Sequence, residues 1–129
     1  MMSEKHIYMK DLHFEHSIWA SELSFCKEEL KIFQQRLGEV SLKNTGHEVL
    51  AQIEHFQNQF IRQNEVIDEY NHEIKQHESH LISEAEKHPT AIEHRYFPDH
   101  KEMRDNMQIF RRLYGELKHE FMNFLVMWM

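Results

Sequence analysis

TGHEVLAQIEHFQNQFIRQNEVIDEYNHEIKQHESHLISEAEKH, residues 45–88, is the stretch that decides the fold. Its apolar residues recur at alternating steps of three and four, the heptad spacing of a helix that packs along partner helices. We call this row of positions the seam, and in this stretch it comprises Ile53, Phe56, Phe60, Gln63, Ile67, Tyr70, Ile74, His77, Leu81, Glu84 and His88. The first two thirds of the seam are almost wholly apolar, and the last third is polar.

Local signals place the ends of this helix. Thr45 is followed three residues later by Glu48, the pattern of a capping box. Pro89 disfavours helical geometry in the residue before it, so the helix should end at His88. A helix over 46–88 would be roughly 65 Å long at about 1.5 Å per residue. We therefore expect neighbouring helices to run alongside it for most of its length.

Two further seams have the same spacing. The first is Met9, Leu12, His16, Trp19, Leu23, Cys26, Leu30, Phe33, Leu37 and Val40. The second is His100, Met103, Met107, Phe110, Tyr114, Leu117, Phe121, Phe124 and Trp128. They predict helices at about 4–40 and 99–128, the latter opened by a capping pair of Asp99 and Glu102. The predicted fold is an all-α, elongated, antiparallel up-down-up three-helix bundle with left-handed coiled-coil packing, in a single domain over 1–129.

Composition narrows the class of protein. Fifteen basic and twenty-two acidic residues give a formal net charge of −7, which argues against a nucleic-acid partner. No apolar run approaches the roughly 18 residues of a membrane span. Cys26 has no second cysteine with which to form a disulfide, which suits a reducing compartment, so we expect a cytoplasmic protein.

Histidine is the unusual component, with twelve residues. In an up-down-up bundle most of them gather at one pole, namely His6, His13, His16, His72, His77, His80, His88, His94 and His100. At the same pole, His80, Glu84 and His88 share one helix face at four-residue spacing. Imidazole and carboxylate groups from facing helices are the ligands with which bundle cores hold transition metals.

The pattern predicts a transition-metal site, for iron, zinc or copper, at this pole. Glu84, His88 and His100 are the first candidates because they lie on seams at one predicted level. His16 and His77 follow, and His13 and His80 flank them. Two alternatives stay open: the histidines are structural or solvated, or they form a pH-dependent switch.

The end of the chain suggests a second function. Residues 121–129 are apolar except for Asn123, which predicts a contact with another copy or another helical protein through Phe121, Phe124, Leu125 and Trp128. A scaffolding coiled-coil protein is therefore the alternative to a metal-binding one. No phosphate-binding loop or activated nucleophile is present in the sequence, so the pattern favours a protein that is not an enzyme, with a metal-dependent oxidase or hydrolase as the one enzymatic alternative.

Overall fold

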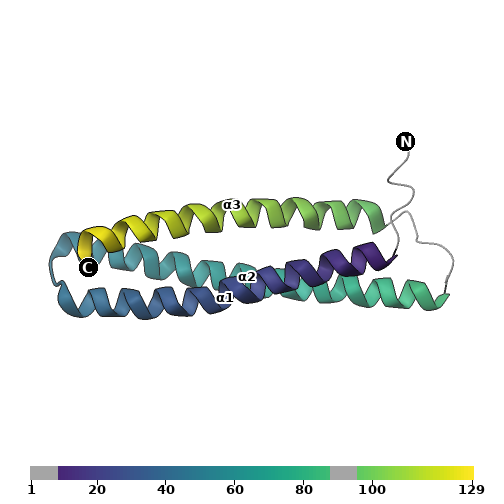
Figure 1. Ribbon diagram of the computed structural model, residues 1–129, viewed down its shortest axis with the longest axis horizontal. Coiled ribbons are helices and arrows are strands. Elements are labelled where there is room, and N and C mark those ends of the chain that lie inside the picture. The colour runs from purple at the N-terminus through teal and green to yellow at the C-terminus, as the bar shows by residue number, and fades with distance from the viewer. Residues whose placement is uncertain (1–8, 88–95) are drawn as a thin grey trace.

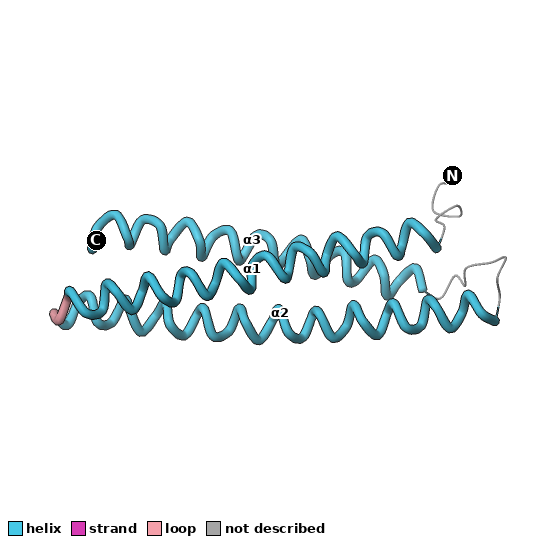
Figure 2. The backbone as a smooth tube through the Cα atoms, turned by 60° about the horizontal axis from the view of Figure 1, so that its bottom comes forward, coloured by secondary structure: helices cyan, strands magenta, loops and turns pink. Residues whose placement is uncertain are grey.

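The computed structural model describes residues 9–87 and 96–129. These residues form three helices and no strand: α1 (Met9–Lys43), α2 (His47–Lys87) and α3 (Tyr96–Trp128). The helices lie along one another in an elongated molecule, with the start of α1, the end of α2 and the start of α3 at one end (Figure 1). A short loop, residues 44–46, joins α1 to α2 at the other end (Figure 2). The prediction of an all-helical protein with three helices is confirmed.

The helix ends differ from the predicted ends by a few residues. Helix α2 begins at His47, and the carbonyl of Gly46 accepts the N–H of Leu50 at 3.1 Å. Gly46 therefore occupies the cap position that the sequence assigned to Thr45, and the predicted capping box is one residue out of register. Residues 1–8 and His88 lie outside the described residues. The predicted start of the first helix near residue 4 and the predicted end of the second at His88 therefore also lie outside them.

Helix α3 begins at Tyr96, three residues before the predicted start at Asp99. Pro98 therefore lies inside the first turn rather than before the helix. Proline is accepted there because the first N–H groups of a helix have no intrahelical acceptor, so a residue without an N–H loses nothing. Helix α1 likewise continues to Lys43, past the predicted end near residue 40.

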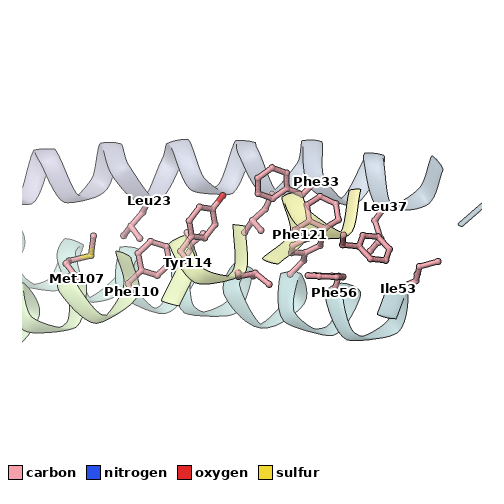
Figure 3. Packing of buried hydrophobic residues seen from close by; sticks show 14 of the residues in the cluster. Leu23, Phe33, Leu37, Ile53, Phe56, Met107, Phe110, Tyr114 and Phe121 are labelled. Atoms are coloured by element: carbon pink, nitrogen blue, oxygen red, sulfur yellow. The ribbon is translucent and has the colours of Figure 1, made fainter. Parts of the chain in front are cut away.

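The core follows the three seams. Its fully buried side chains include Leu23, Leu30, Phe60, Ile67, Met107 and Phe121. Phe121 of α3 lies beside Phe33 of α1 (Figure 3), with ring centroids 5.2 Å apart. It also packs against Phe60 of α2, with ring centroids 5.0 Å apart. All three helices therefore meet at this aromatic cluster, where ring packing adds to the burial of apolar surface.

The apolar C-terminal segment is partly used inside the molecule. Phe121 and Phe124 are buried in the chain's own core, and Leu125 and Trp128 are half-buried against it. This corrects the expectation that Phe121 and Phe124 are available to a partner, since helix α3 turns them inward. The exposed apolar side chains of this segment are Met122, Val126, Met127 and Met129.

Three ion pairs join α1 to α3 at heptad intervals. Glu22 accepts two hydrogen bonds from Arg111, at 2.6 and 2.7 Å, and Glu29 accepts one from Lys118 at 2.8 Å. Glu15 and Arg104 form the third pair, at 2.9 and 3.0 Å. Each pair joins residues 89 positions apart in the sequence. The two helices therefore keep a constant alignment over two heptads.

No helix in the described part of the chain is long and apolar enough to cross a membrane.

The aromatic cluster predicts a large stability difference between two residues of the C-terminal segment. Replacing the fully buried Phe121 with alanine should lower the free energy of unfolding by about 3–5 kcal/mol, because it removes apolar burial and leaves a cavity. Val126, 86% exposed, provides the control, and Val126→Ala should change stability by less than about 0.5 kcal/mol. Urea unfolding followed by circular dichroism measures both, and equal effects would contradict the packing described.

Candidate functional site

The histidines His16, His77 and His100 meet in the core, one from each helix. We call them the histidine cluster. The ring centroid of His16 lies 5.3 Å from that of His100 and 6.0 Å from that of His77. His16 and His100 are each only 4% exposed, and His77 is half-buried. Trp19 covers the cluster on one side, with its ring 5.0 Å from that of His100 and 5.7 Å from that of His16.

Carboxylates hold two of these rings by one nitrogen each. His16 Nδ1 is 2.8 Å from Glu78 Oε1, and His100 Nε2 is 2.5 Å from Glu15 Oε1. An ionised carboxylate only accepts hydrogen bonds, so the N–H lies on those two nitrogens. In a neutral His16 ring the lone pair is then on Nε2, and this atom is buried without a hydrogen-bond partner. It is an acceptor enclosed in the core and left unused.

Further groups fix the two carboxylates. Arg104 donates to both oxygens of Glu15, from Nε at 3.0 Å and from Nη2 at 2.9 Å. Glu78 also accepts a hydrogen bond from the exposed His13. Partial burial alone would raise the pKa of Glu15, but the bonds from Arg104 and His100 outweigh it and hold that pKa below its usual value. The pKa of Glu78 is likewise lowered, because bonds from His16 and His13 outweigh burial.

Two imidazoles of the cluster are held neutral. Burial lowers the pKa of His77, and the neighbouring His16 adds to the effect, while Asp99 and Glu102 of α3 oppose it. Burial also lowers the pKa of His100 and outweighs the opposing hydrogen bond to Glu15. The site therefore combines neutral imidazoles with ionised carboxylates around them near neutral pH.

The remaining sequence candidates lie elsewhere. Glu84 is buried on α2 seven residues beyond His77, which is about 10 Å along the helix axis. His80 is exposed, and His13 is exposed beside Glu78. His88 lies outside the described residues. The structure thus brings together one first-choice residue, His100, with the second-choice residues His16 and His77.

Sequence reasoning missed Glu15, Glu78 and Arg104 because it considered only histidines and residues at seam positions. These three flank the seams, where charged residues ordinarily face solvent. A signal was present for two of them. Glutamates recur every seven residues at 15, 22 and 29, and basic residues recur with the same period at 104, 111 and 118.

Among the described residues, no group of three or more histidine, cysteine, aspartate or glutamate side chains is placed to hold a metal ion as the side chains stand. What the cluster offers is imidazole nitrogen in a largely dry site, with carboxylates behind two of the rings. As the described side chains stand they share no ion, so metal binding would need a change of ring orientation.

Comparisons with protein-family models, with curated proteins and with solved structures give no match to this chain.

The lowered histidine pKa values predict that acid destabilises the metal-free protein. The unfolded chain takes up protons near pH 6.5, whereas folded His77 and His100 take them up at lower pH. The free energy of unfolding should therefore be greatest above 6.5 and fall as the pH drops through that value, by up to about 1.4 kcal/mol per pH unit for each proton. Glu15 and Glu78, lowered from 4.5, add a second decline at more acidic pH.

Urea unfolding between pH 8 and 5, with a chelator present, measures this dependence. A double variant, His77→Gln with His100→Gln, should show a shallower decline between pH 7 and 5. The exposed His119 and His47 provide the matched control, because replacing both with glutamine leaves the cluster intact. If the control and the cluster variant flattened the curve equally, the buried histidines would not be its cause.

Proposed function

We propose that this chain is a small cytoplasmic helical-bundle protein that binds one transition-metal ion at the histidine cluster. One observation carries the proposal: His16 Nε2 is a buried nitrogen without a hydrogen-bond partner, while Nδ1 of the same ring is held by Glu78. Leaving a buried acceptor unpaired is unfavourable, so its retention calls for a compensating interaction. A metal ion bound by that nitrogen supplies one.

The spacing of the rings supports a shared ion. With zinc–nitrogen bonds of about 2.1 Å and tetrahedral angles, two imidazole rings on one ion have centroids about 5 Å apart. The His16–His100 separation of 5.3 Å matches this value, and the His16–His77 separation of 6.0 Å is within a small side-chain adjustment of it. At these separations, binding would need only a reorientation of the His77 and His100 rings toward His16, and the helices would keep their positions.

The carboxylates accept the hydrogen bonds that metal-binding histidines usually donate from their second ring nitrogen. A ligating imidazole commonly donates its other N–H to a carboxylate, which fixes the ring and strengthens the ligand. Glu78 does this for His16, and Glu15, itself held by Arg104, does it for His100. Imidazole ligands suit zinc, copper and iron, so the proposed ion is one of these.

The bundle topology belongs to the same proposal. We take the fold as an antiparallel up-down-up bundle with left-handed coiled-coil packing. Its support lies in the contacts: Glu15, Glu22 and Glu29 pair with residues whose numbers rise in step, as in parallel α1 and α3. Between α1 and α2 the order reverses, since His16 contacts His77 whereas Phe33 contacts Phe60. Cytoplasmic location is supported by the single cysteine, Cys26, which has no second cysteine in the sequence with which to form a disulfide.

A titration of untagged, chelator-treated protein with zinc, copper(II) and iron(II) tests the proposal. We expect one ion per chain by isothermal titration calorimetry, and at a free metal concentration 100 times Kd a gain of about 2.7 kcal/mol in the free energy of unfolding. His16→Ala should abolish this binding. His77→Gln, at a half-buried position, should weaken it at least about tenfold without endangering the fold.

The double variant of His47 and His119 is the control for adventitious binding, because both side chains are exposed and lie outside the cluster. It should bind like the unaltered protein. X-ray absorption of the loaded protein should show nitrogen neighbours at about 2.0–2.1 Å for zinc. Weak binding at several sites that the His16 and His77 substitutions do not alter would refute the proposal.

A further inference from the structure

A groove runs between α2 and α3 along the half of the molecule opposite the histidine cluster. It consists of two adjoining hollows of about 510 and 400 Å³, which share His55 and Glu120. On α2 the groove extends from Ala51 to Tyr70, and on α3 from Ile109 to Met127. At about 1.5 Å per residue this length is roughly 29 Å, or about five helical turns.

The floor of the groove is apolar and incompletely covered. Val66, Phe110 and Leu117 form its deeper part. Ile109 and Leu113 are 46% and 43% exposed within it. Gln63 also lines the groove. It is only 8% exposed, and its side-chain oxygen has no hydrogen-bond partner. The groove therefore offers an apolar surface to a binding partner.

The charges around the groove are predominantly negative. Glu116 and Glu120 line it from α3, and Glu69 and Glu73 lie beside Tyr70 on α2. Burial raises the pKa of Glu73, and the nearby carboxylates of Glu102 and Glu69 raise it further. The one lysine or arginine lining the groove within the described residues is Arg62, and it already binds Glu65 and Glu69.

The opposite side of α3 provides a contrast. There the glutamates of α1 are paired with Arg104, Arg111 and Lys118, so the α1–α3 side carries matched charges. On the α2–α3 side Arg112 pairs with Glu116 at 3.6 Å, and the carboxylates around the groove still outnumber the cations. A bound group of positive charge would relieve this excess.

We propose that the α2–α3 groove binds an amphipathic helix of another protein, with an apolar stripe and basic flanks, as a fourth helix of the bundle. A helix fits because its own backbone hydrogen bonds are satisfied, so it can lay side chains into an apolar groove five turns long. Basic flanks fit because they meet the acidic rim. A second copy of this chain fits less well, since it carries a formal net charge of −7.

The probe is a synthetic helical peptide of about 21 residues with leucine at a and d positions and lysine at the flanking positions. Fluorescence anisotropy with the full chain, in chelator, should show saturable binding that weakens as salt rises. A peptide with glutamate in place of lysine should bind at least about tenfold more weakly. Equal binding of the two peptides would overturn the proposal.

Two matched substitutions locate the binding. Leu113→Arg places a cation on the groove floor and should weaken binding about tenfold or more. Phe25→Arg makes the same kind of change at an apolar residue of α1, 64% exposed, and should leave the affinity unaltered. Circular dichroism checks that both variants fold, and Glu116→Gln provides a milder change, expected to weaken binding and reduce its salt dependence.

Several results would contradict the proposal. They are binding lost equally in the Leu113 and Phe25 variants, binding unaffected by both groove substitutions, and absence of saturable binding. A dimer of this chain in sedimentation equilibrium that Leu113→Arg converts to a monomer would assign the groove to a second copy and would equally overturn the assignment to a basic partner helix.

Discussion

The structure depends on covering the seam of α2 along its whole length. A helix of 41 residues with one apolar face is stable only when neighbours bury that face, because helix formation alone contributes little in water. Helices α1 and α3 provide the cover, and this fixes which residues share a level. Phe60 meets Phe33 and Phe121 in one half, and His77 meets His16 and His100 in the other. The histidine cluster is thus a consequence of the same packing that forms the core.

At the histidine level, the seams of α1 and α3 carry polar residues, His16 and His100, that are still buried. Enclosing His16 and His100 is unfavourable unless their polar atoms are paired, and Glu78 and Glu15 pair one nitrogen of each ring from flanking positions. Arg104 then neutralises Glu15, so this end of the α1–α3 ion-pair series also supports the cluster. These contacts do not satisfy Nε2 of His16, which is buried without a hydrogen-bond partner.

The heptad pattern predicted most of the fold, because its period reports directly which side chains are buried. Leu23, Leu30, Ile67 and Met107 were all placed on seams, and all are buried. The site was harder to predict because the level at which helices meet depends on loop geometry, and an error of four residues moves a ligand by about 6 Å. This is why His16 and His77, rather than Glu84, proved to accompany His100. The start of α3 was placed too late because Pro98 was interpreted as a boundary, although the first turn of a helix accepts proline.

Helix α3 has two unlike sides, and this difference bears on how the molecule can be completed. Toward α1, its basic residues meet glutamates at a constant alignment, so charge and packing are both satisfied within the chain. Toward α2, the pair of His55 and Glu120, at 2.9 Å, crosses the groove, and apolar side chains such as Leu113 stay half-exposed beside it. A surface that joins exposed apolar groups to excess carboxylates is unfavourable for a protein in isolation and favourable for one that binds a basic amphipathic partner. The same asymmetry separates the two proposed sites, because the cluster is closed by all three helices whereas the groove is formed by two.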